Sequence, residues 1–381
     1  MKNSFPLATS IGILGGGQLG RMFIENALRY DLEIHILDPS ANAPCAHLTA
    51  HFTQGDFKDF ETVYQFGKNL DVITIEIEHV NTEALYKLEE EGVKVIPTAK
   101  AIETIKDKGL QKQFYADYEI RSSLFQIIEN KAELQNHTSF LPFFQKARKD
   151  GYDGKGVVAI NSVDDFDKAF DVPSVLEKSV DIEKEISVIV AKDQFGNIEL
   201  YPVVELVFDP VYNLVDYLIA PAQITEQQAT KACRLAKRVC EGFHSPGLFA
   251  VELFLSKEGE ILVNETAPRA HNSGHHTIEA SISSQFDQHL RILLGLPLGS
   301  TKSYPAAAMI NLVGSEGHIG KVSYEGVNEI SAQENVYLHL YGKEITKPGR
   351  KMGHVSVIGS NFDEVLEKID FVKKNLRAIT R

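Results

Sequence analysis

Residues 264–275 read NETAPRAHNSGH, a run that gathers an amide, a carboxylate, a guanidinium and imidazoles around one proline and one glycine. Such a density of polar and charged groups is not expected in a hydrophobic core. Directly before this run, the apolar residues 261–263 follow the apolar residues 251–255 across the polar run SKEGE at 256–260. Two apolar runs joined by a short polar turn predict a β-hairpin.

The predicted hairpin places Glu252 and Glu265 roughly opposite each other. Like charges on paired strands destabilise the pairing, so two carboxylates there favour a cation between them. Carboxylates and the amide oxygen of Asn264 suit Mg²⁺, which usually keeps waters and shares phosphate oxygens with a substrate. The alternative is a solvated hairpin edge with scattered acids, because glutamates are common on protein surfaces.

Size and charge narrow the class of protein. A chain of 381 residues is longer than one hydrophobic core supports, so two or three domains are expected. The 39 basic and 52 acidic side chains give a net charge of −13, which disfavours nucleic acid or an anionic membrane as the main partner. An anionic substrate must therefore be met by local basic residues.

Cysteine usage and the N-terminus bear on the compartment. Cys45, Cys233 and Cys240 form no metal or redox spacing, and an odd number argues against a disulfide framework. Residues 1–10 lack the apolar segment of a signal peptide, and the sequence has no run of about 18 apolar residues that could span a bilayer. We therefore expect a cytoplasmic protein without a membrane partner.

The first hundred residues predict a small parallel α/β sheet. An apolar strand at 11–14 runs into the glycine-rich turn GGGQLG at 15–20, which opens a helical pattern, and a second strand ends at Asp38. A further strand at 72–77 carries Glu76 toward its carboxyl end. Ligands of such sheets bind at the carboxyl ends of the strands.

The glycine-rich turn has two interpretations. Gly15, Gly17 and Gly20, with Asp38 eighteen residues further on, formally satisfy the dinucleotide fingerprint, so a nicotinamide dehydrogenase is one alternative. The other is that the glycines only let the turn close and the helix pack, which leaves the helix N-terminus free to hold any phosphate.

The composition changes near residue 100, where we place a domain boundary, because a lysine-rich helix is predicted over 107–115. Beyond it, strands are predicted at 143–146 and 157–160, joined by the loop RKDGYDGKG at 148–156. Backbone N–H groups and lysine charges in such a loop can hold phosphates. It is not a Walker loop, and a solvated hairpin tip is the alternative.

The C-terminal part predicts strands at 306–312, 336–340 and 355–358, followed by a helix. Between these strands lie Lys343, Arg350 and Lys351, a cluster of basic residues in an acidic protein. Loops carry function more often than packing, so this cluster suits a phosphate. A solubilising run of charge is the alternative.

The order of these parts resembles the ATP-grasp superfamily. Over almost the whole chain it is similar to the family of 5-(carboxyamino)imidazole ribonucleotide synthetases, through GGGQLGRM at 15–22, GYDGKG at 151–156, NETAPRAHNSGH at 264–275 and GRKMGH at 349–354. The resemblance implies an α/β (α+β ATP-grasp) architecture. It comprises an N-terminal Rossmann-like parallel sheet domain over 1–100, an ATP-grasp domain over 101–298 and a small C-terminal α+β domain over 299–381.

The resemblance also implies an activity. This is the carboxylation of 5-aminoimidazole ribonucleotide by bicarbonate in purine biosynthesis, with ATP as co-substrate and with Mg²⁺, or alternatively Mn²⁺, as cofactor. Bicarbonate would take the γ-phosphate of ATP to give carboxyphosphate, and the exocyclic amine would then capture carboxyphosphate or the CO₂ that it releases. The implied protein is a homodimer that acts on small molecules and binds neither nucleic acid nor a membrane.

Residue roles carried over from the family fall into four groups. The metal ligands would be Glu252 and Glu265. The ATP-binding residues would be Lys108, Lys146, Gly151, Tyr152, Asp153, Gly154, Lys155, Gly156, Glu177, Lys178, Ser179, Val180, Glu185, Glu205, Asn264 and Glu265. The carboxylation pocket would comprise Arg269, His271 and Asn272, with Asp153 as a further catalytic residue. The nucleotide substrate would contact Gln18, Leu19, Glu76, Tyr152, Lys343, Arg350 and Lys351.

Three alternatives to the carboxylating ligase stay open from the sequence. A formate-using glycinamide ribonucleotide transformylase shares the architecture. A nicotinamide dehydrogenase would use the turn at 15–20 and Asp38. An ATP-binding module without catalysis is the third alternative.

Overall fold

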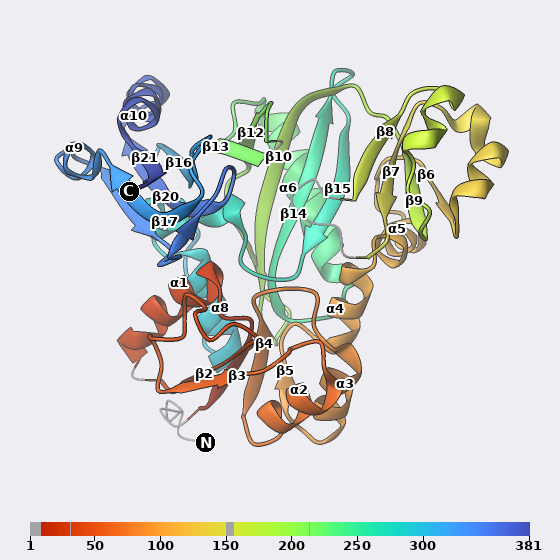
Figure 1. The fold of residues 1–381 in the computed structure, drawn as a ribbon. Coiled ribbons are helices and arrows are strands. Elements are labelled where there is room, and N and C mark those ends of the chain that lie inside the picture. The colour runs from red at the N-terminus through yellow and green to blue at the C-terminus, as the bar shows by residue number, and fades with distance from the viewer. Residues whose placement is uncertain (1–8, 31, 150–155, 213) are drawn as a thin grey trace.

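A computed structural model describes residues 9–30, 32–149, 156–212 and 214–381 (Figure 1). The N-terminal part forms a five-stranded sheet in the order β3-β2-β1-β4-β5, in which every pairing is parallel. This confirms the predicted parallel sheet. Its strands are β1 (Ile11–Leu14), β2 (Ile34–Asp38), β3 (His51–Gln54), β4 (Val72–Ile75) and β5 (Lys94–Val95).

Apolar side chains explain why β1 lies at the centre of this sheet, since all four of its residues are buried. The helices of this part are α1 (Gln18–Ala27), η1 (Leu28–Tyr30), α2 (Phe60–Gly67), α3 (Thr82–Glu90) and α4 (Ala99–Lys106). The expected boundary at residue 100 falls inside α4. Helix α4 ends at Lys106, and the next residue, Asp107, is the N-cap of α5 (Lys108–Asp117). The carboxylate of Asp107 accepts hydrogen bonds from the N–H groups of Gly109 and Leu110.

A four-stranded antiparallel sheet in the order β6-β9-β7-β8 follows in the chain. The predicted strands on either side of the glycine-rich loop are present and pair with each other as β7 and β8. This sheet comprises β6 (Phe125–Ile128), β7 (Phe143–Ala147), β8 (Val157–Ile160) and β9 (Ser174–Lys178), with the 3₁₀ helices η2 (Lys131–Phe140) and η3 (Val163–Lys168).

The largest sheet runs in the order β15-β14-β10-β12-β13-β16-β20-β18, with β11 paired to β10. Helix α6 (Glu226–Gly242) packs on β10, β14 and β15. The strands are β10 (Ile182–Lys192), β11 (Ile198–Leu200), β12 (Val204–Asp209), β13 (Leu214–Ala220), β14 (Gly247–Ser256), β15 (Ile261–Ala267), β16 (Ala306–Val313), β18 (Val336–Leu340) and β20 (Lys351–Gly359).

This sheet is continuous across the expected boundary at residue 298. Strand β13 pairs with β16 in antiparallel register, so the C-terminal strands extend the central sheet instead of forming a separate one. The physical reason is that an open strand edge gains hydrogen bonds from a neighbour, and Ile219 of β13 shares a hydrophobic cluster with Ile310 of β16. In Figure 1 the C-terminal strands of this sheet and the four-stranded sheet lie on opposite sides of β10 and β14.

The remaining elements are a small C-terminal sheet and the helices that pack around the large sheet. A three-stranded sheet in the order β19-β17-β21 and helix α10 lie at the C-terminus. Helix α8 packs against α1, β10 and β14, so one core joins the N-terminal part to the large sheet. These elements are η4 (Asn272–Gly274), α7 (Thr277–Ala280), α8 (Gln285–Leu294), β17 (Gly320–Glu325), α9 (Val327–Ser331), β19 (Ile345–Thr346), α10 (Phe362–Asn375) and β21 (Arg377–Thr380). Among the described residues, none of the helices combines the length and apolar character needed to cross a bilayer.

Candidate active site

The predicted hairpin is present as β14 and β15, and Glu252 is the direct register partner of Glu265. The register shifts beside this pair, because Leu253 opposes Val263 while Glu252 opposes Glu265, which leaves Asn264 as an extra residue on β15. Such a β-bulge interrupts the alternation of side chains and re-aims them. Val263 stays in the core, while Asn264 and Glu265 reach the lysines described below.

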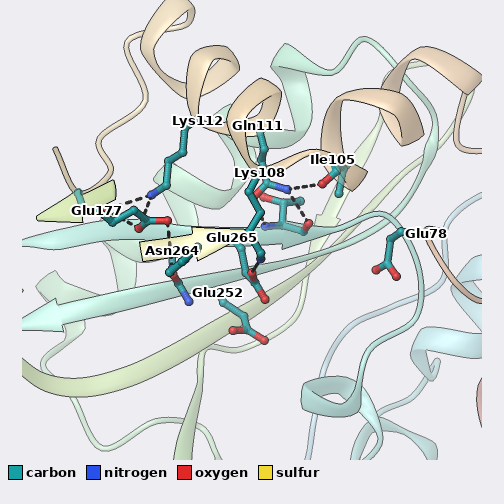
Figure 2. Close-up of polar contacts among 12 residues, drawn as sticks. Glu78, Ile105, Lys108, Gln111, Lys112, Glu177, Glu252, Asn264 and Glu265 are labelled. Carbon is teal, nitrogen blue, oxygen red and sulfur yellow. Dashed lines mark hydrogen bonds and ion pairs between the residues drawn. The ribbon is translucent and has the colours of Figure 1, made fainter. Parts of the chain in front are cut away.

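Figure 2 draws both carboxylates, and their partners differ. The ammonium of Lys108 lies 2.5 Å from Oε2 of Glu265, and Nε2 of His271 lies 3.3 Å from Oε1 of Glu252. The Lys108 charge lowers the pKa of Glu265, whereas burial and the carboxylates of Glu265 and Glu185 raise the pKa of Glu252. The pair therefore combines one firmly ionised carboxylate with one that holds its proton more readily.

Lys146 brings the four-stranded sheet to this hairpin. From β7, its ammonium donates to Oδ1 of Asn264 at 3.0 Å and lies 3.1 Å from Oε1 of Glu177. The predicted phosphate-binding residues Lys108 and Lys146 thus converge on neighbouring residues of β15. Two lysines beside two carboxylates and an amide match the groups that a metal-bound polyphosphate requires.

Glu177 is a buried counter-ion. Its second oxygen lies 2.9 Å from the ammonium of Lys112 and accepts a hydrogen bond from Ser123 Oγ at 2.8 Å. Burial opposes ionisation of Glu177, but the charges of Lys146 and Lys112 outweigh it and lower its pKa to about 2. The predicted contact of Glu177 with ATP would have to share a carboxylate whose two oxygens already have protein partners.

Lys112 and Gln111 are site residues that sequence reasoning missed. Gln111 donates to the carbonyl of Thr266 at 3.2 Å and accepts from its N–H at 3.1 Å, so its amide fixes the backbone directly after Glu265. The sequence signal that could have found them is helical spacing, because positions three and four residues after Lys108 lie on the same helix face.

The other described residues predicted to bind ATP are more dispersed. The ammonium of Lys178 donates to the carbonyls of Phe140 and Leu141 at 3.1 and 2.7 Å. Glu205 forms an ion pair with Lys184 at 2.7 Å. Burial raises the pKa of Glu185. Ser179 and Val180 follow β9 directly and are partly buried.

The predicted carboxylation pocket lies where the hairpin meets the N-terminal part. Nη2 of Arg269 lies 2.8 Å from Oε1 of Glu78, which follows β4. Asn272 exchanges amide hydrogen bonds of 2.9 and 3.0 Å with Asn311 of β16, a partner that the sequence did not indicate. Arg269 thus contacts the N-terminal part, His271 contacts one of the paired acids, and Asn272 contacts the C-terminal strand β16.

His275 and His276 lie next to this pocket and are fully buried. The backbone at 272–274 is a 3₁₀ turn. Burial lowers the pKa of both imidazoles, that of His276 to about 4. Both rings are therefore neutral near pH 7.

The glycine-rich turn is filled by protein groups. The carboxylate of Glu76 accepts hydrogen bonds from the N–H groups of Gly17 and Leu19, and that of Asp38 accepts from Gly16 N–H at 2.8 Å. Burial raises the pKa of Glu76. Because carboxylates occupy the N–H groups that a dinucleotide pyrophosphate would need, the geometry argues against the nicotinamide alternative.

The predicted substrate-binding residues partly gather at this turn. The ammonium of Lys343 donates to Gln18 Oε1 at 2.8 Å and to the carbonyl of Lys351 at 2.7 Å. Lys351 is the first residue of β20, so its expected position in a loop was wrong; the pairing of β20 with β16 extends to it. Arg350 donates to the carbonyl of Ile345 at 2.5 Å.

Five predicted residues, Gly151, Tyr152, Asp153, Gly154 and Lys155, lie outside the described residues. Gly156 is described and has a φ of 74°, a conformation that favours glycine. Its carbonyl accepts a hydrogen bond of 2.8 Å from Ala147 N–H, which closes the base of the hairpin.

Three family models match successive parts of the chain. They are the ribonucleotide synthetase preATP-grasp domain over residues 8–106, the ATP-grasp domain over residues 113–286 and the phosphoribosylaminoimidazole carboxylase C-terminal domain over residues 307–368. Their order agrees with the order of the expected parts.

Curated relatives match almost the whole chain. The N5-carboxyaminoimidazole ribonucleotide synthase of Brucella melitensis is 36% identical, with 94% of this chain and 98% of the relative covered. The chloroplastic phosphoribosylaminoimidazole carboxylase of Vigna aconitifolia is 37% identical over 93% of this chain. The chain spans 65% of the length of that plant relative.

Solved structures agree with these relatives. The N5-carboxyaminoimidazole ribonucleotide synthetase of Thermotoga maritima superposes with a TM-score of 0.89 at 39% identity, covering 98% of this chain and 100% of that one. The synthase of Aspergillus clavatus, in complex with ADP and 5-aminoimidazole ribonucleotide, gives a TM-score of 0.88 at 34% identity, covering 96% and 98%.

Proposed function

The chain belongs to the N5-carboxyaminoimidazole ribonucleotide synthetase family, and on this premise we propose that it carboxylates 5-aminoimidazole ribonucleotide with bicarbonate at the expense of ATP. It is an ATP-grasp ligase. Bicarbonate oxygen attacks the γ-phosphorus and ADP leaves, which gives carboxyphosphate. The exocyclic amine nitrogen then bonds to the carboxyl carbon, the bond from that carbon to the phosphate oxygen breaks, and phosphate leaves while the nitrogen gives up one proton.

One observation carries the proposal. Lys108, from a helix, and Lys146, from the four-stranded sheet, meet Glu265 and Asn264 on the large sheet. Phosphoryl transfer requires positioning and neutralisation of charge more than covalent help, and this convergence supplies cations and oxygen ligands without a nucleophile. Lys108 and Lys146 would bind the phosphates of ATP through their ammonium groups.

Glu252 and Glu265 fit a divalent cation. They are register partners, their donor atoms are all oxygens, and in this structure Lys108 and His271 provide the positive or hydrogen-bonding partners of the two carboxylates. We propose that they hold Mg²⁺, or Mn²⁺ in its place, which when bound would neutralise phosphate charge during the transfer.

Arg269, His271 and Asn272 would receive bicarbonate and carboxyphosphate. His271 contacts Glu252 of the paired acids, and Arg269 contacts Glu78, which follows β4. The ribonucleotide would lie beyond them against Gln18, Leu19 and Glu76, where Lys343 already reaches Gln18. A labile intermediate formed between these two groups of residues has a short path to the amine, which limits its loss to water.

Other parts of the proposal rest on the family resemblance. These are a role for Asp153 and its loop, contacts of Arg350 and Lys351 with the 5′-phosphate, a homodimeric state and a cytoplasmic location. The division into parts 1–100, 101–298 and 299–381 is proposed as functional; in the fold, α4 and the continuous sheet cross the two divisions.

A coupled assay for ADP release tests the activity. The rate should depend on both bicarbonate and 5-aminoimidazole ribonucleotide, and the product should be the carboxylated amine. ATP hydrolysis that is indifferent to the ribonucleotide would contradict the proposal. Formate that replaces bicarbonate in product formation would instead favour the transformylase.

A further inference from the structure

Helix α5 presents four polar side chains on one face. Lys108, Gln111, Lys112 and Tyr115 stand at helical spacing, and the last three are almost completely buried, with 4, 2 and 0% of their surface exposed. Figure 2 shows the first three extending from the helix toward β15 and Glu177. Lys108 and Gln111 contact β15, the strand that carries the proposed metal ligand Glu265, whereas Lys112 contacts Glu177.

Two lysines share the carboxylate of Glu177. Lys112 lies 2.9 Å from Oε2, and Lys146 lies 3.1 Å from Oε1. The Lys112 side chain is 3% exposed and the Lys146 side chain 13% exposed. The ammonium of Lys112 also donates to Ser123 Oγ at 3.0 Å, while that of Lys146 extends to Asn264 at 3.0 Å. Lys146 is therefore the one of the two that reaches the candidate triphosphate site.

The charges of Lys112, Lys146 and Glu177 have to be considered together. Two ammonium groups and one carboxylate leave one net positive charge at Lys146. Without Lys112, the charges of Glu177 and Lys146 would neutralise each other. Because both side chains are largely buried, their attraction would then be strong and would oppose an interaction of Lys146 with a phosphate. A phosphate would then compete with Glu177 for the ammonium of Lys146.

We propose that Lys112 is a positioning residue of the nucleotide site: by compensating Glu177, it leaves the charge of Lys146 available to the triphosphate. This inference rests on the proposed role of Lys146 in binding ATP. The network also links four separate elements, because Lys112 belongs to α5, Glu177 to β9, Lys146 to β7 and Asn264 to β15.

The protonation states agree with this role. Burial lowers the pKa of Lys112 to about 8, against the opposing effect of Glu177, so its ammonium is still mostly charged near pH 7. The ionisable groups that act on it are Glu177 from β9, Lys146 from β7 and Lys108 from its own helix.

Substitution at Lys112 separates charge from packing. Lys112→Met keeps the length of the side chain but removes the charge, whereas Lys112→Arg keeps the charge in a bulkier group. We expect Lys112→Met to weaken the binding of ATP with Mg²⁺ by about tenfold to a hundredfold, because a hydrogen bond to a charged group is worth about that much in affinity. Lys112→Arg should bind within about threefold of the wild type, and KM for the ribonucleotide should stay unchanged in both.

The measurement is calorimetric titration of the full chain with ATP and Mg²⁺, together with thermal melting and the split between KM for ATP and kcat. Lys106→Met is the matched control, because the Lys106 ammonium on α4 donates its hydrogen bonds to the carbonyl of Val80 and to Thr82 Oγ1, which belong to the N-terminal part. This variant should bind ATP like the wild type. If Lys112→Met does not fold, Lys112→Gln, which is neutral but can still hydrogen-bond Glu177, replaces it with the same expected loss.

A purely structural role gives the opposite result. In that case the neutral variants would lose melting temperature and keep their affinity for ATP, and Lys112→Arg would be the more damaging change because of its bulk. That outcome would overturn the inference. Because the titration does not require turnover, it is independent of the ADP-release assay, in which failure of the wild type to respond to the ribonucleotide would instead remove the proposed function.

Discussion

Glu252 and Glu265 face each other as register partners on adjacent strands, yet Lys108 pairs with Glu265 and not with Glu252. The imidazole of His271 lies 3.3 Å from Glu252, and the charges of Lys108 and Lys351 also act on this carboxylate, but burial and the carboxylates of Glu265 and Glu185 outweigh them and raise its pKa. An isolated pair of carboxylates at this distance in the sheet would be destabilising. The arrangement therefore supports the proposal that a divalent cation binds between the two carboxylates.

Glu265→Gln should remove most of the activity and leave the fold intact. The substitution keeps the shape of the side chain and deletes half of the carboxylate charge proposed to hold Mg²⁺, so we expect a loss of about a hundredfold or more in ribonucleotide-dependent ADP release. Glu260→Gln, at the exposed turn of the same hairpin, is the control and should be active. A wild-type rate in Glu265→Gln, with an unchanged melting curve, would refute the metal site.

Arg350→Ala should weaken binding of the ribonucleotide. Its guanidinium is proposed to take the 5′-phosphate, and loss of one charge-assisted contact should raise KM for 5-aminoimidazole ribonucleotide about tenfold, with KM for ATP unchanged. Initial rates at saturating ATP measure the effect. The control is Lys374→Ala, in the last turn of α10. An unchanged KM for the ribonucleotide would contradict the proposed phosphate contact.

Glu78→Gln should impair the use of bicarbonate. Glu78 holds Arg269 by an ion pair of 2.8 Å, and the neutral amide leaves the guanidinium without this anchor. We expect KM for bicarbonate to rise about tenfold, since misplacing a substrate-binding group is costly in catalysis. Rates measured over a range of bicarbonate concentrations test this, and an unaltered bicarbonate dependence would show that Glu78 does not position Arg269 for the reaction.

Acid should destabilise the protein through Glu177. Its pKa is about 2 in the fold, against an ordinary value of 4.5, so the unfolded chain takes up a proton before the folded protein does. The contribution of Glu177 to stability is therefore complete above pH 4.5 and is lost as the pH falls from 4.5 through about 2.

Thermal melting between about pH 6 and pH 3 measures this contribution. The melting temperature of Glu177→Gln should fall less steeply with acid than that of the wild type. Glu258→Gln, at the exposed hairpin turn, should follow the wild type. Parallel curves for wild type and Glu177→Gln would exclude Glu177 as a source of the acid sensitivity.

Local patterns in the sequence were sufficient for much of the architecture. The apolar run at 11–14 and its glycine-rich turn predicted β1 and the helix after it, and the two apolar runs beside SKEGE predicted the β14–β15 hairpin. Hydrophobic periodicity and turn residues act over a few positions, so they can be recognised in a single chain. The ordered motifs added the family, which the comparisons confirm.

Other features depended on tertiary packing. The bulge at Asn264 decides that Glu265 faces the site, since strict alternation would have sent it to the core side with Val263. The pairings of Glu177 with Lys112 and of Asn272 with Asn311 join residues that are far apart in the chain. The sheet also continues from β13 to β16 across the expected boundary.

The sequence by itself thus determined which chemical groups this protein contains and which helices and strands carry them. The tertiary structure decided which charges meet. A strand pattern records the direction of each side chain only until one extra residue shifts the register, and an ion pair between distant residues leaves no periodic trace in the chain. The balance of charge around Lys146 and Glu265 therefore exists only once α5, β7, β9 and β15 have packed together.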